Sequence, residues 1–121
     1  MLSLYLVNSN HAFDLFKKNR ISIYNDLPRN SKPLYVRCQS GNDDLGMRTL
    51  YPGQGFDWSF RKNVFGETLF FCHFYWESKE RVFDVFNVNW EHVYRVYNYV
   101  VKIDGFYQST DKTKVRKIGI W

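Results

Sequence analysis

The sequence predicts an all-β protein, a single antiparallel β-sandwich of about eight short strands. Aromatic residues make up 20% of the 121 residues, and Phe, Tyr and Trp favour strands. Alanine occurs once, at Ala12, and no window carries an apolar stripe at helical spacing. Short alternating runs are separated by turn residues, without repeats or a linker, so we expect one domain.

The first strands are expected at residues 21–24, 34–39 and 45–50. The first ends in the turn sequence Asn-Asp-Leu-Pro at 25–28, and the third precedes a turn at 51–55 that contains Pro and Gly. Alternation in the second strand places three apolar side chains on one face, namely Leu34, Val36 and Cys38.

The middle of the chain contains the clearest alternation. In the run at 56–61, Phe56, Trp58 and Phe60 share one face. The run at 68–76 is the most hydrophobic, and we expect it to be a central strand. Its two faces carry Phe70, Cys72, Phe74 and Trp76 on one side, and Leu69, Phe71, His73 and Tyr75 on the other.

The last strands are expected at residues 81–86, 94–103 and 115–121. Asp104-Gly105 follows the second of these and is a strong hairpin dipeptide, so the chain should turn back through Phe106 and Tyr107. These runs complete the set that a sandwich requires.

The N-terminal residues 1–12 resemble the end of a signal peptide, because a short apolar run meets small polar residues. A frayed first strand is the alternative. We therefore expect residues 13–121 to form the domain, in an extracellular protein. No stretch reaches the roughly 18 apolar residues of a spanning helix, so no membrane span is expected.

Charge and motifs favour a binding protein over an enzyme. The formal net charge is +5, yet no nucleic-acid reader motif is present, and we expect no nucleic-acid partner. Cys72 and His73 are adjacent in a strand, so they point to opposite faces and cannot act as nucleophile and base. Three carboxylates that glycoside chemistry could use, Glu77, Glu80 and Glu91, show no sign of converging on a cleft.

No cofactor or metal ion is expected. The acidic segment 42–44 lacks the ligand spacing of an EF-hand. The three histidines, His11, His73 and His92, lack zinc-finger spacing with the two cysteines. The sequence also contains no N-x-S/T glycosylation signal.

The segment 87–95 is the candidate partner-binding site. It is richer in aromatic residues than a core requires, and aromatic and Arg side chains are favoured at binding hot spots. The candidate residues are Asn87, Asn89, Trp90, Glu91, His92, Tyr94 and Arg95.

From residue 21 to 107 the chain resembles the plant self-incompatibility protein S1 family. The order and spacing of seven motifs carry the resemblance. They are N-D-L-P at 25–28, V-R-C-x-S at 36–40, D-D-L-G at 43–46, P-G-x-x-F-x-W-S-F at 52–60, T-L-F-F-C-x-F-Y-W at 68–76, F-D-V-F at 83–86 and V-V-K-x-D-G-F-Y at 100–107.

The resemblance implies a secreted plant protein ligand that acts on a cell-surface protein receptor. It is typified by the pistil proteins that arrest self pollen. We expect the protein to be a monomer. A carbohydrate-binding or cell-wall module is the alternative, because exposed aromatic side chains and basic charge also suit a cell-wall polysaccharide.

The cysteines depart from the family pattern, because the second pair that usually precedes the V-V-x-x-D-G segment is absent. The simplest inference from this joint absence is a disulfide between Cys38 and Cys72. The alternative is two buried free thiols. A bridge would require the strands at 34–39 and 68–76 to lie close together, either as sheet neighbours or across the sandwich.

Overall fold

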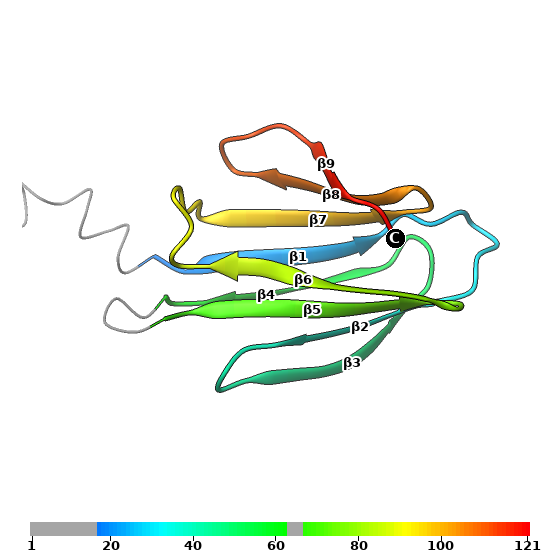
Figure 1. Ribbon diagram of the computed structural model, residues 1–121, viewed down its shortest axis with the longest axis horizontal. Coiled ribbons are helices and arrows are strands. Elements are labelled where there is room, and N and C mark those ends of the chain that lie inside the picture. Colours follow the sequence, from blue (N-terminus) through cyan, green and yellow to red (C-terminus); the bar gives the residue numbers. More distant parts are fainter. Residues whose placement is uncertain (1–16, 63–66) are drawn as a thin grey trace, which may run out of the picture.

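The computed structural model describes residues 17–62 and 67–121, so the expected signal-peptide remnant at 1–12 lies outside the described residues. The described chain forms nine strands in two sheets, which confirms the all-β sandwich prediction (Figure 1). The strands are β1 (Asn19–Asn25), β2 (Leu34–Gln39), β3 (Asp44–Leu50), β4 (Gly55–Phe60), β5 (Leu69–Trp76), β6 (Lys79–Asn87), β7 (Val96–Lys102), β8 (Gly105–Thr110) and β9 (Arg116–Gly119).

One sheet has the strand order β4-β1-β7-β8-β9, and the other has the order β3-β2-β5-β6. The pairs are antiparallel except for β1 and β7, which run parallel with Ile21 opposite Tyr97. The sequence led us to expect a wholly antiparallel sandwich. The parallel β1–β7 pair corrects that expectation. Alternation specifies which face of a strand is buried, but it does not specify the direction of its neighbour.

Burial follows the predicted alternation closely. In β2 the side chains of Leu34, Val36 and Cys38 are fully buried. In β5 every second side chain is buried, and the strand lies between β2 and β6, as predicted for a central strand. The aromatic side chains of β4 face the core but stay half-buried, because β4 is an edge strand.

The two sheets meet through aromatic side chains. Phe74 of β5 packs against both Phe83 and Phe106, at ring-centroid distances of 5.1 and 5.0 Å. Phe106 belongs to β8 of the opposite sheet, so this contact crosses the sandwich. Trp58 of β4 packs edge-on against Phe70 of β5 at 5.6 Å. Such interlocked rings explain why a chain of this size needs so many aromatic residues.

Cys38 and Cys72 form a disulfide with a Cα–Cα distance of 4.0 Å. The two residues lie directly opposite each other in the register of β2 and β5. Both are fully buried. The bridge therefore joins neighbouring strands of one sheet and does not cross the sandwich.

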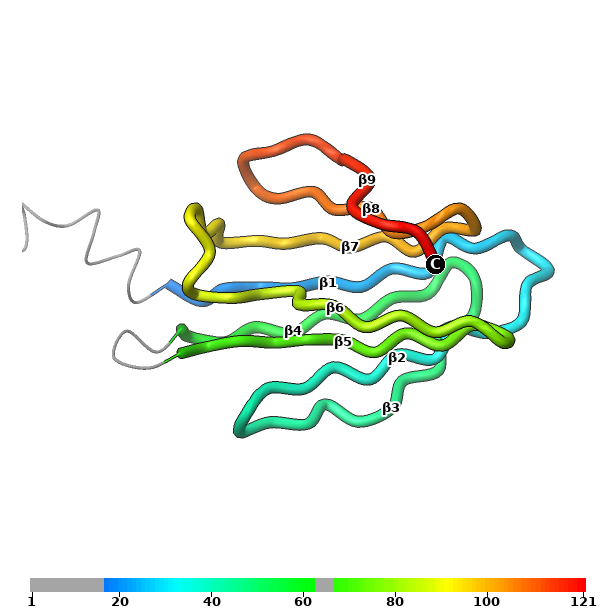
Figure 2. Tube along the Cα trace, in the orientation of Figure 1, coloured from blue at the N-terminus to red at the C-terminus, as the bar shows by residue number. Residues whose placement is uncertain are grey.

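The connections gather at the two ends of the strands (Figure 2). At one end the tight β5–β6 turn contains Glu77, which has a positive φ of 54°. At the other end lies the connection between β6 and β7, residues 88–95, which contains most of the candidate binding segment. Asn19 holds this connection against β1, because its buried side chain donates a hydrogen bond of 2.9 Å to the carbonyl of Tyr94.

Candidate functional site

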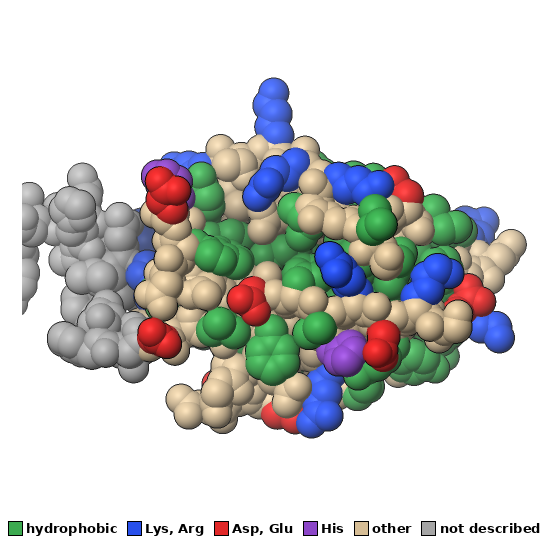
Figure 3. All heavy atoms as spheres, in the orientation of Figure 1, with side chains coloured by type: hydrophobic (Ala, Val, Ile, Leu, Met, Phe, Trp, Pro, Cys, Tyr) green, Lys and Arg blue, Asp and Glu red, His purple; other side chains and the backbone are tan. Residues whose placement is uncertain are grey.

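A hollow of about 570 Å³ opens on one side of the sandwich. We call it the edge hollow, because its walls come from the edge strands β6 and β9, from β7 and β8, and from the 88–95 connection. Its aromatic lining consists of Phe83, Trp90, Tyr94, Tyr97 and Phe106. Its polar lining consists of Arg81, Asp84, Glu91, His92, Gln108 and Arg116. Figure 3 shows hydrophobic side chains on this face with charged side chains of both signs around them.

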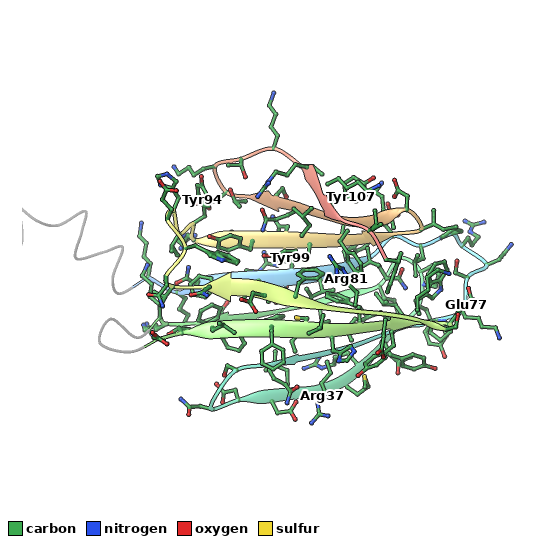
Figure 4. The ribbon with its side chains drawn as sticks, viewed as in Figure 1. Arg37, Glu77, Arg81, Tyr94, Tyr99 and Tyr107 are labelled. Atoms are coloured by element: carbon green, nitrogen blue, oxygen red, sulfur yellow. A yellow bond between two sulfur atoms is a disulfide. The ribbon has the colours of Figure 1, made fainter. Side chains whose placement is uncertain are left out.

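The aromatic lining of the edge hollow is continuous with the core. Tyr97 and Phe106 are buried, and Phe83 packs edge-on against Phe106 at 5.1 Å. Trp90 is half-buried and lies 5.4 Å from the ring of Tyr97. Tyr94, shown at the end of the strands in Figure 4, also packs against Tyr97 at 6.0 Å. The aromatic rings of the connection are thus fixed by the core and remain partly open to solvent.

A chain of hydrogen bonds orients the polar side of the edge hollow. Arg116 donates to the Oε1 atom of Gln108 at 3.3 Å, and Gln108 donates through Nε2 to the hydroxyl of Tyr99 at 3.0 Å. Tyr99 in turn donates to the backbone carbonyl of Val85 at 2.6 Å. The chain runs from β9 through β8 and β7 to β6, so it links the two sheets and fixes the amide of Gln108.

Burial raises the pKa of Tyr99 above its ordinary value, and burial also raises the pKa of Tyr97. A raised pKa in the folded state means that folding favours the neutral phenol. The contribution of these neutral phenols to the free energy of unfolding is therefore fully present below the unfolded pKa of about 10. It decreases as the pH rises above that value.

We expect the free energy of unfolding to fall steadily above about pH 10, and Tyr99→Phe to reduce that slope. At neutral pH the same variant should be less stable by about 1–3 kcal/mol, because the carbonyl of Val85 and the amide of Gln108 lose a buried partner. Urea unfolding across the alkaline range measures both effects. Tyr24→Phe is the control, since Tyr24 is 42% exposed. An unchanged slope in Tyr99→Phe would contradict the assignment.

The edge hollow brings together part of the candidate segment. Trp90, Glu91, His92 and Tyr94 line it. Asn87 and Asn89 do not, and the Oδ1 atom of Asn87 instead accepts a 2.8 Å hydrogen bond from the backbone N–H of Asn89, which stabilises the turn.

Arg95, the remaining candidate, lies at a second hollow of about 560 Å³ with Lys17, Lys62 and Lys112. We call this second site the basic hollow. Its acidic residue is Asp111, whose Oδ1 atom accepts a hydrogen bond from the backbone N–H of Val96. In the part of the chain that the structure describes, the four cationic side chains form no ion pair, so the basic hollow carries excess positive charge.

Four polar residues of the edge hollow were missed by the sequence analysis, namely Arg81, Asp84, Gln108 and Arg116. Arg81 carried a readable signal, because alternation places its charged side chain on the same face as Phe83. Asp84 lies beside a register shift in the pairing of β5 and β6, which alternation does not anticipate.

The residues considered for catalysis take other roles. Cys72 is in the disulfide, and His73 stacks on Tyr75 at 4.1 Å with its Nε2 atom 3.5 Å from Glu80. Glu91 lines the edge hollow, whereas Glu77 and Glu80 lie on the β5–β6 hairpin. Within residues 17–62 and 67–121 no group of three or more His, Cys, Asp or Glu side chains could hold a metal ion. No helix among these residues is long and apolar enough to cross a membrane.

The fold and the edge hollow define a small disulfide-bonded β-sandwich with a recess lined by aromatic and charged side chains. The chain belongs to the plant self-incompatibility protein S1 family, whose model matches residues 20–121.

Individual relatives agree with this assignment. S-protein homolog 2 of Arabidopsis thaliana is 40% identical over 65% of this chain and 48% of its own length. S-protein homolog 12 of the same plant is 32% identical over 94% of this chain and 72% of its own length. The chain thus matches about half of the first relative and most of the second.

A solved structure of a self-incompatibility protein homologue superposes with a TM-score of 0.70, covering 87% of this chain and 95% of the other at 20% identity. That protein belongs to a widespread family described as small, highly stable, secreted proteins from plants. At this identity the similarity establishes the fold.

Proposed function

We propose that the protein is a secreted extracellular ligand that binds a cell-surface receptor, and that the face around the edge hollow makes the contact. Membership of the S1 family supports the general role. Secretion is supported by the description of the structural homologue, by the apolar run in residues 1–12, and by a buried disulfide, which is typical of oxidising compartments.

The observation that carries the proposal is the clustering of hot-spot residue types around one recess. Trp, Tyr and Arg contribute most to binding energy at protein interfaces, and they act best in pockets that exclude water. Trp90, Tyr94 and Arg116 all border the edge hollow. Loops on a rigid sandwich are also the usual carriers of recognition. The proposed action is therefore binding and not catalysis.

The test is binding of the labelled, full-length secreted protein to plant cell membranes, measured with unlabelled protein as competitor. We expect saturable binding that Arg116→Ala weakens about tenfold or more, as at an interface hot spot. Lys114→Ala is the matched control, because Lys114 is an exposed cation two residues away that does not line the edge hollow. Binding that does not saturate, or that both variants weaken equally, would contradict the proposal.

The basic hollow favours a second candidate function, attachment to an acidic cell-wall polysaccharide. Its four cations, Lys17, Lys62, Arg95 and Lys112, would attract a polyuronate. Exposed charges are screened beyond about 8 Å at physiological ionic strength, so this binding should disappear with moderate salt. Arg95→Ala with Lys112→Ala should abolish it, while salt-resistant binding would contradict this candidate.

A further inference from the structure

We infer that the edge hollow binds a neutral sugar residue, the pyranose unit of an extracellular glycan. This inference rests on the proposed function and deepens it, because it names the chemistry that the receptor-contact face recognises. The glycan belongs either to the receptor or to the cell wall, and the chemistry of the sugar ring is the same in both.

The size and shape of the edge hollow suit a sugar. Its volume of about 570 Å³ lies within the range of roughly 300–1,000 Å³ typical of small-molecule sites. A pyranose presents C–H groups on its faces, and these pack against aromatic rings. Trp90 and Tyr94 supply half-buried rings, held in place by their contacts with the buried Tyr97.

The polar lining matches the hydroxyl groups around the ring. Each hydroxyl both donates and accepts, so a sugar site needs planar donors and acceptors together. Asp84 and Glu91 supply carboxylate acceptors, and Arg81 supplies guanidinium donors. Among the described residues Asp84 has no hydrogen-bonded or ionic partner, so its oxygens are available to a ligand.

The amide of Gln108 is oriented before any ligand arrives. Arg116 and Tyr99 hold its two ends, and each end keeps a second hydrogen-bonding position, one N–H and one lone pair. A group fixed in this way loses little conformational freedom when it binds, which favours affinity.

Charge balance indicates that the sugar is neutral. Two arginines, Arg81 and Arg116, face two carboxylates, Asp84 and Glu91, so the edge hollow has no excess charge when His92 is neutral. A phosphate or a uronic acid would gain little there and is better matched by the basic hollow. A neutral polyhydroxyl ligand satisfies both kinds of charged group.

The test is NMR titration of the oxidised, ¹⁵N-labelled full chain with neutral monosaccharides, namely glucose, galactose, mannose, xylose, arabinose and fucose, and with galacturonate. We expect at least one neutral sugar to shift the indole N–H signal of Trp90 saturably and without dependence on salt. Trp90→Phe assigns that signal, and the indole of Trp58 is the internal control, because Trp58 packs against Phe56 and Phe70, and none of these three residues lines the hollow.

Matched variants test the polar contacts. Asp84→Asn should weaken sugar binding about tenfold, while Glu80→Gln on the same strand should leave it unchanged. Both residues are exposed, so neither variant should affect folding. The inference is overturned if no neutral sugar shifts Trp90. It is also overturned if galacturonate alone binds and shifts only Arg95 and Lys112.

Membranes treated with glycosidases separate this inference from the proposed function. Loss of saturable membrane binding after deglycosylation supports both and identifies the receptor as the source of the glycan. Membrane binding that survives deglycosylation, together with no neutral-sugar shift at Trp90, supports the receptor and overturns the sugar site. Sugar-dependent shifts at Trp90 without any membrane binding would support the sugar site and indicate a cell-wall glycan as its ligand. They would contradict the proposal that the protein binds a receptor.

Discussion

Reduction of the Cys38–Cys72 disulfide should lower the free energy of unfolding by about 3–4 kcal/mol. The bridge closes a loop with a sequence separation of 34 residues, and it restricts the unfolded chain far more than the folded one. The loss is a substantial fraction of the stability of a small domain, which is about 5–15 kcal/mol. Urea unfolding with and without reductant measures it.

The Cys38→Ala, Cys72→Ala double variant provides the control for this experiment. It should be destabilised without reductant and insensitive to reductant. Because both sulfur atoms are fully buried, the variant also leaves a small cavity and should be slightly less stable than the reduced protein. A wild-type midpoint that reductant does not move would show that the bridge contributes no stability.

Phe74→Ala should lower the free energy of unfolding by about 3–5 kcal/mol. The side chain is fully buried, and its ring packs against Phe83 of the same sheet and Phe106 of the opposite sheet. Removing it opens a cavity where the two sheets meet, and the rigid strands around it cannot close the gap.

Phe71→Ala is the matched control for Phe74→Ala. Phe71 lies on the same strand but on its outer face, where it is only half-buried. We expect a clearly smaller loss of stability there, because part of the ring already contacts water. Equal losses in the two variants, measured by urea unfolding with unchanged m-values, would show that the two faces of β5 are not distinguished by burial.

The faces of the strands could be predicted from the sequence because alternation has a direct physical cause. A side chain at every second position of β5 points inward, and the inward positions carry Phe70, Cys72, Phe74 and Trp76. The family resemblance added the disulfide, which alternation allowed but did not require. Both predictions depend on local sequence.

The edge hollow could be predicted only in part. The aromatic excess of residues 87–95 indicated Trp90 and Tyr94, because hot-spot residues outside the core suggest a contact surface. Arg116 and Gln108 come from strands that approach the hollow only through the order of the sheets. The parallel direction of β1 and β7 was missed for the same reason, since neither strand specifies its partner.

The parallel β1–β7 pair has a consequence for the folding pathway. Its register joins Ser22 to Asn98, whose side chains are hydrogen-bonded at a separation of 76 residues. Such a long-range contact forms slowly, because a large loop must close first. The β5–β6 hairpin, by contrast, closes through the two residues between Trp76 and Lys79.

The four-stranded sheet should therefore form before the five-stranded sheet is complete. Until β7 and β8 emerge and pair beside β1, the inner ring of Phe74 lacks Phe106, its partner in the opposite sheet. A nascent chain is thus most prone to aggregation before β7 and β8 are synthesised. Folding of this protein is expected to be largely post-translational, with the parallel pair as its final step.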